Sequence, residues 1–234
     1  MPIKKIIFII ISLLLIITIF MIQEPNQKEK NSEKIEETMV ELPDPDKAGD
    51  LSLEESISER RSIRNYQDNP LTLKEISQIL WSAQGITDPA SDFRAAPSAG
   101  ALYPLSLYLS INNVENLDPG LYEYIVDDHE LKLKLDKSVK DEIYNVALQQ
   151  TSIKESSVIF IIAADYEITE RKYRDRAQRY VHMEAGHAGQ NIYLQTTALD
   201  LGTVAIGAFH DDGLKEILGI DEDPIYLFPV GNKN

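Results

Sequence analysis

The sequence contains no cysteine. This absence excludes disulfides, thiol nucleophiles, zinc and iron–sulfur sites with cysteine ligands, and acylation of a cysteine. Positive charge is also scarce, because 23 Lys and Arg stand against 38 Asp and Glu and give a formal net charge of −15. We expect no nucleic-acid partner, since binding to phosphates requires clustered Lys and Arg. Any anionic ligand must therefore be held by a local basic cluster.

Several motifs that mark common enzyme classes are missing as well. The chain has neither a phosphate loop ending in Gly-Lys-Ser/Thr nor a Gly-x-Gly-x-x-Gly sequence. Ser98 does not lie in a Gly-x-Ser-x-Gly elbow, so the main sign of hydrolase chemistry is absent. His182 and His187 are five residues apart, about 140° around a helix, and would not share a face. The sequence therefore predicts no metal site.

The N-terminus carries the one long apolar run of the chain. Residues 6–22 are free of charge and follow Lys4 and Lys5. As a helix this run would span roughly 26 Å, near the lower limit for crossing a bilayer. We predict that residues 1–22 form a single-pass membrane anchor, with the N-terminus in the cytoplasm and the rest on the extracytoplasmic side. A cleaved signal peptide, giving a secreted protein, is the alternative.

The next segment differs sharply in composition. Residues 23–50 contain nine acidic residues, four lysines and three prolines, with few large apolar side chains. Such a segment cannot bury enough apolar surface to offset its ordering entropy. We therefore predict an acidic flexible linker over residues 23–50 and a globular domain over residues 51–234.

Apolar periodicity within residues 51–234 indicates an α+β domain, with a mixed central sheet and helices packed on it. Ser52 with Glu55, and Thr72 with Glu75, have the spacing of capping boxes that begin helices. Further helices are predicted at 139–150, 174–201 and 212–218, and strands at 105–111, 121–126, 130–135, 158–164, 203–209 and 225–230. Gly186 and Gly189 inside the long helix are unfavourable unless close packing requires them.

Three segments are candidates for a ligand site. The first is Arg60-Arg61-Ser62-Ile63-Arg64-Asn65-Tyr66, in which three arginines form a basic island. Arginine suits phosphate because its planar fork donates two parallel hydrogen bonds, although a solvated charge cluster is an equal alternative. The second, Ala96 to Pro104, and the third, Leu201 to Phe209, are rich in small residues. Small residues allow backbone to approach a flat ligand closely.

Together these motifs, in this order, resemble the nitroreductase superfamily, and Ser-Ala-Gly-Ala-Leu-Tyr-Pro at residues 98–104 is similar to the signature of its SagB-type dehydrogenase branch. The resemblance implies a nitroreductase-like fold, a swapped homodimer and FMN bound at the dimer interface. It assigns Arg60, Arg61, Ser62 and Arg64 to the phosphate, ribityl chain and pyrimidine end of FMN. Pro97, Ser98, Ala99 and Gly100 would lie over the flavin ring of the other subunit, Ile206 and Gly207 would pass its N5 atom, and Lys233 would meet the phosphate.

The same resemblance implies hydride transfer through flavin N5, to or from a small-molecule or peptide substrate, with NAD(P)H or another electron donor. Tyr103 is the candidate proton donor. Azoline-oxidising members of the branch carry a catalytic lysine and tyrosine, and the sequence alone does not locate this pair. The alternative function is a non-catalytic flavin-binding or dimeric interaction module at the membrane surface.

Overall fold

The computed structural model describes residues 38–234. The predicted membrane anchor at residues 1–22 lies outside this part of the chain, as does most of the predicted linker. Among the described residues, no helix combines the length and the apolar character needed to cross a membrane. The anchor therefore stays a prediction.

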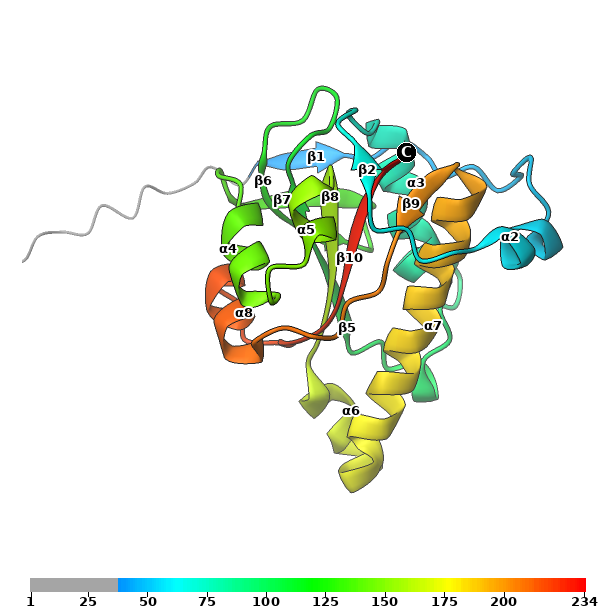
Figure 1. The fold of residues 1–234 in the computed structure, drawn as a ribbon. Coiled ribbons are helices and arrows are strands. Elements are labelled where there is room, and N and C mark those ends of the chain that lie inside the picture. Colours follow the sequence, from blue (N-terminus) through cyan, green and yellow to red (C-terminus); the bar gives the residue numbers. More distant parts are fainter. Residues whose placement is uncertain (1–37) are drawn as a thin grey trace, which may run out of the picture. The chain divides into compact units, whose positions relative to one another are not determined.

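A sheet of eight strands forms the centre of the domain (Figure 1). Its order is β1-β7-β6-β5-β8-β10-β2, and β9 also pairs with β10. The strands are β1 (Met39–Glu41), β2 (Tyr66–Gln67), β5 (Leu105–Ile111), β6 (Gly120–Ile125), β7 (Glu130–Leu135), β8 (Val158–Ala164), β9 (Leu201–Thr203) and β10 (Asp223–Lys233). All of these strands pair antiparallel, and the parallel part of the predicted mixed sheet is limited to the isolated Leu71–Val114 bridge.

Helices cover both faces of this sheet, which confirms the predicted α+β class. On one face lie α3 (Leu73–Gln84) and the long α7 (Ala177–Ala198), and on the other lie α4 (Lys140–Val146), α5 (Thr151–Glu155) and α8 (Asp211–Leu218) (Figure 1). Strand β8 explains this arrangement. Its apolar side chains alternate between the two cores, with Phe160 and Ile162 facing α3 and α7, and Ile159 and Ile161 facing the other three helices. A strand that is buried on both faces has a continuous run of apolar residues, as β8 does.

Both predicted capping boxes are present. Ser52 begins α2 (Leu53–Glu59) and Thr72 begins α3, and in each case the side chain of the glutamate three residues later bonds back to the cap backbone. The N–H groups of a first helical turn have no partner inside the helix, so this reciprocal bonding stabilises the start. The short sheet of β3 (Ile86–Asp88) and β4 (Phe93–Arg94) follows α3.

Three predicted elements differ from the structure. The helix expected at 139–150 is shorter, because α4 ends at Val146 and the positive φ of Leu148 and Gln149 separates it from α5, which begins only at Thr151. The helix expected at 174–201 begins as a 3-10 turn at Arg174–Arg176, with positive φ at Arg174, and continues as α7 to Ala198. The preceding helix α6 (Tyr166–Tyr173) was not predicted. The strand expected at 203–209 ends at Thr203, and only Ile206 pairs again, with Leu227. Apolar periodicity does not register single backbone reversals of this kind.

The folded domain also begins earlier than predicted. Residues 38–50 were expected to belong to the flexible linker, yet Met39–Glu41 forms β1 on β7 and Leu42 is buried. The Ser77 hydroxyl donates to the Pro43 carbonyl, and the side chain of Gln78 bonds to both backbone groups of Asp46. Main-chain pairing at a sheet edge orders this acidic segment although it has few apolar side chains.

Candidate functional site

Tyr193 of α7 connects two of the segments that the sequence singled out. Its hydroxyl shares a 3.0 Å hydrogen bond with the Ser62 hydroxyl and accepts the Ala205 N–H at 2.7 Å. The guanidinium of Arg60 lies 5.1 Å from the centre of the same ring. The basic island and the segment after β9 are therefore neighbours. Sequence analysis missed Tyr193, because a tyrosine inside an apolar helix pattern carries no local signal.

A backbone hydrogen bond from Ile63 N–H to the Thr203 carbonyl, 2.9 Å long, fixes the basic island along β9. Tyr66 lies at its end, buried, and its hydroxyl donates to the carbonyls of Ile63 and Pro229 at 2.8 and 3.0 Å. Burial raises the pKa of Tyr66, so this hydroxyl keeps its proton. The Tyr66 hydroxyl therefore has a structural role, since it joins the basic island to β10.

The other basic residues of the predicted site are Arg61, Arg64 and Lys233. Lys233 lies opposite Tyr66 in the β10–β2 pairing, and its ammonium contacts the Asp200 carboxylate at 2.9 Å. Arg61 donates to the carbonyls of Ser58 and Arg60, while Arg64 is exposed. A lysine ammonium has three donors, so Lys233 retains capacity for a second anionic partner.

Ile206 and Gly207 lie where the chain leaves β9. Ile206 is buried, and its N–H and carbonyl both bond to Leu227, at 2.8 and 2.9 Å. Gly207 is exposed. Among residues 38–234, none accepts a hydrogen bond from the Gly207 N–H. This free backbone donor lies two residues beyond Ala205, whose N–H bonds Tyr193.

Residues 97–103, called here the Ser98 loop, have an unusual backbone. Gly100, Ala101 and Tyr103 adopt positive φ of 68°, 53° and 50°, the last two without the freedom of glycine. Side chains fix this conformation: Ser98 Oγ accepts the Tyr103 N–H at 2.9 Å, and the Tyr103 hydroxyl accepts the Arg94 N–H at 3.2 Å. The Arg94 guanidinium lies 4.7 Å from the Tyr103 ring. Tyr103, the candidate proton donor, thus stabilises the loop, and its catalytic role stays a prediction.

Two side chains from the end of α6 cover this loop. A Cβ atom built on Gly100 would lie 2.6 Å from Lys172 Nζ and 2.8 Å from the Tyr173 hydroxyl. A larger residue at position 100 would displace these two side chains, and its φ of 68° would also be strained. Lys172 and Tyr173 are therefore functional candidates that the sequence analysis did not locate. In the sequence they are distinguished only by being consecutive in a charged stretch before the long helix.

The Ser98 loop contacts α7 at a different turn from the basic island. The His187 imidazole donates to the Pro97 carbonyl at 3.4 Å, whereas the contacts of Arg60 and Ser62 are made at Tyr193. Six residues of helix separate these points by about 9 Å. The structure describes one chain, so a second subunit that would bring the loop to another basic island stays a prediction.

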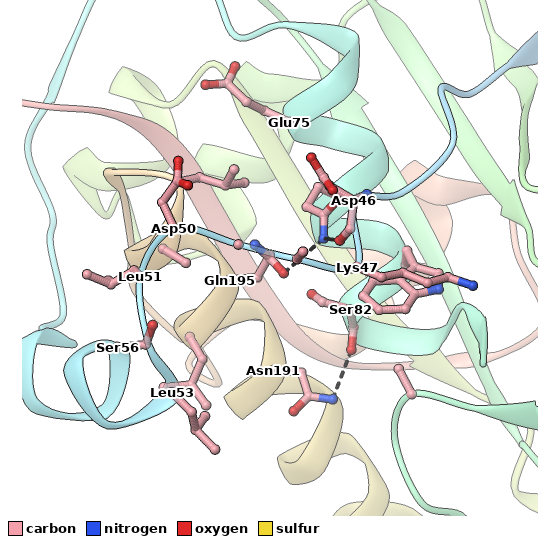
Figure 2. Close-up of a pocket in the computed structure, with 18 of the residues that line it drawn as sticks. Asp46, Lys47, Asp50, Leu51, Leu53, Ser56, Glu75, Ser82, Asn191 and Gln195 are labelled. Atoms are coloured by element: carbon pink, nitrogen blue, oxygen red, sulfur yellow. Dashed lines mark hydrogen bonds between the residues drawn. The ribbon is translucent and has the colours of Figure 1, made fainter.

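A separate cavity of about 790 Å³ lies between residues 46–53, α3 and α7. Figure 2 shows its polar lining, in which Gln195 faces the Gln78–Asp46 pair and the Asn191 amide donates to the Ser82 carbonyl. None of the residues predicted to bind a ligand lines this cavity. Its lining carries both charge signs. Within residues 38–234, no three His, Asp or Glu side chains converge as metal ligands.

The chain is similar to proteins of one known family. The family model of the nitroreductases matches residues 57–232. A nitroreductase homologue of Methanocaldococcus jannaschii is 46% identical over 194 residues, which cover 83% of this chain and 96% of that protein. The microcin B17-processing protein of Escherichia coli is 26% identical over 166 residues, 68% of this chain and 60% of that protein. A solved nitroreductase homologue from Ralstonia eutropha has a TM-score of 0.74 and 25% identity, covering 84% of this chain and 90% of that one.

Proposed function

The chain belongs to the nitroreductase family, in its SagB-type branch, and from this premise we propose that it is an oxidoreductase that depends on FMN. FMN would supply hydride transfer at its N5 atom. The observation that carries the proposal is the Tyr193 hydroxyl, which bonds Ser62 on one side and Ala205 on the other. Through it, the basic island is joined to the segment that carries the free Gly207 N–H two residues further along.

The residues present suit FMN. Arg60, Arg61 and Arg64, together with Lys233, would hold the phosphate by charge and by hydrogen bonds. Ser62 would donate to the polar chain of the cofactor. The exposed Gly207 N–H would donate toward N5, and such a donor stabilises a reduced flavin. The negative net charge of the chain disfavours an anionic ligand elsewhere on its surface, which makes the basic island the favoured location.

We further propose that Lys172 and Tyr173 hold and move protons at the site. Both side chains approach Gly100 of the Ser98 loop, and the ammonium of Lys172 lies 5.5 Å from the Tyr173 ring centre. These residues would act in a homodimer in which the Ser98 loop of one subunit covers the flavin of the other. That arrangement accounts for the separation of loop and basic island along α7.

The substrate is proposed to be a small molecule or a peptide, with NAD(P)H or another electron donor. The likeness to a microcin-processing protein supports the peptide, although this chain spans 60% of that protein. Residues 1–22 are proposed to anchor the enzyme in the membrane, with the domain on the extracytoplasmic side.

The test is reduction of the purified, FMN-loaded full chain by NADH, NADPH and dithionite, followed by reoxidation by acceptors. An enzyme should pass electrons from a donor to an acceptor through many cycles. Bound FMN that dithionite reduces but that no acceptor reoxidises at a useful rate would favour the non-catalytic flavin-binding module. An Arg64→Gln variant should bind FMN about tenfold more weakly, since one charge-assisted bond is lost, whereas Arg179→Gln on the exposed part of α7 should not.

A further inference from the structure

Two buried polar side chains close to the Ser98 loop have atoms without hydrogen-bond partners. Gln84, at the end of α3, is fully buried, and Glu184 of α7 is 2% exposed. Neither amide atom of Gln84 has a partner in the described chain, and Glu184 Oε1 has none either. Folded proteins pair nearly all buried polar atoms, so unpaired atoms beside a candidate site call for a functional explanation.

The groups that act on Glu184 are also those that hold Tyr103. Burial raises the pKa of Glu184 to about 7, and the Ser98 hydroxyl and the Arg94 guanidinium partly oppose that rise. Ser98 accepts the Tyr103 N–H, and Arg94 lies over the Tyr103 ring. A change in the charge of the Glu184 carboxyl therefore alters the interactions of both Ser98 and Arg94, the two residues that contact Tyr103.

The loop needs such support. Alanine and tyrosine at positive φ, as at residues 101 and 103, are unfavourable and persist only where the surroundings hold them. Of the groups around the loop, Ser98 is in the best position to respond to Glu184, because its hydroxyl can donate to the carboxyl while its oxygen accepts the Tyr103 N–H.

We propose that Glu184 is a positioning residue that sets the order of the Ser98 loop. The ionised carboxylate forms a charge-assisted hydrogen bond with the Ser98 hydroxyl, which directs the Ser98 oxygen toward the Tyr103 N–H. The protonated carboxyl is a weaker acceptor and leaves the loop freer to open. This coupling is a property of the chain alone, whereas its consequence for flavin binding rests on the proposed function.

Other titratable or charged groups face the same region and must be separated from Glu184. Arg94 comes from β4, Tyr103 from the loop itself, His187 from the next turn of α7, and Lys172 and Tyr173 from α6. The end of α3 contributes the uncharged Gln84. A variant of His187, the neighbour on the same helix, therefore serves to separate its contribution from that of Glu184.

The test is hydrogen exchange at the Tyr103 amide in the full chain without added FMN, measured one unit below and one unit above pH 7 and corrected for the intrinsic exchange rate. Protection should rise about tenfold with pH in the wild type, the difference between a neutral and a charge-assisted bond. It should not change with pH in Glu184→Gln. His187→Asn, and Glu170→Gln at an exposed position of α6, should both keep the rise.

A rise of the same size in Glu184→Gln would overturn the proposal, and so would its disappearance in His187→Asn alone. Ser98→Ala gives a second route, since it removes the acceptor of the Tyr103 N–H and should abolish the pH dependence while the fold remains intact. FMN titration at the same two pH values separates the two proposals. A chain that binds no FMN but shows the exchange pattern would refute the flavin site and leave the coupling intact.

Discussion

Replacing Glu184 by glutamine should stabilise the protein, and increasingly so as the pH rises. Burial raises the pKa of this carboxyl from 4.5 to about 7. Each pKa unit corresponds to about 1.4 kcal/mol, so the folded chain bears a cost of about 3 kcal/mol when Glu184 is ionised. Because the folded pKa lies above the unfolded one, the folded state binds more protons between these values. The contribution of Glu184 to the free energy of unfolding is therefore most favourable below pH 4.5 and falls as the pH rises to about 7.

Glutamine has the same shape and does not ionise, so Glu184→Gln escapes this cost. Its introduced amide can donate to the unpaired Gln84 Oε1. Urea denaturation of the full chain, kept in mild detergent because of the predicted anchor, should show the variant about 3 kcal/mol more stable above pH 7. The difference should shrink toward zero as the pH approaches 4.5. Glu170→Gln on exposed α6 is the control and should show no such trend. A difference independent of pH, or one that grows as the pH falls, would refute the reasoning.

Three further predictions test the packing and the site. Tyr193→Phe removes the hydroxyl that bonds Ser62 and Ala205, so we expect a loss of about 1–2 kcal/mol in urea denaturation and weaker FMN binding; unchanged values would contradict the assigned role. Gly189→Ala should destabilise by about 1–3 kcal/mol, because its Cβ would lie 2.7 Å from Phe228, whereas Gly186→Ala meets open space and should stabilise the chain by up to about 1 kcal/mol. Equal effects at the two glycines would refute the packing argument, and a loss of dimer only in Gly186→Ala would locate the subunit interface. Lys172→Gln and Tyr173→Phe should lower kcat at least about tenfold with little change in FMN affinity, measured by steady-state kinetics and titration, and full activity in both would exclude the pair from proton transfer.

The sequence predicted those features of the fold that depend on local patterns. Both capping boxes, the strands at 105–111 and 158–164 and the hairpin are present as expected, because each has a signal within a few residues. The expected close packing at Gly189 is also present, against the Phe228 ring. Gly186 is exposed, and a Cβ atom built on it would meet nothing in the described chain. Packing within one subunit therefore does not explain why a glycine occupies this helix position.

Features that depend on distant contacts were not predictable in this way. Strand β1 is ordered by pairing with β7, about 90 residues away in the chain, and its composition alone indicates a linker. Tyr193 contacts Ser62 across 131 residues, and Lys172 and Tyr173 meet Gly100 only after α6 folds back on the loop. The motifs located the segments of the site, whereas the contacts that join them required the structure.

The central claim is that the basic island and the Gly207 segment bind FMN. The most direct measurement is the visible absorption spectrum of the purified full-length chain, followed by release and identification of any yellow cofactor. The account predicts FMN, one per chain, taken up readily by a preparation that lacks it. A colourless protein that also fails to bind added FMN would contradict the account, and the arginines at residues 60, 61 and 64 would then be a solvated surface cluster.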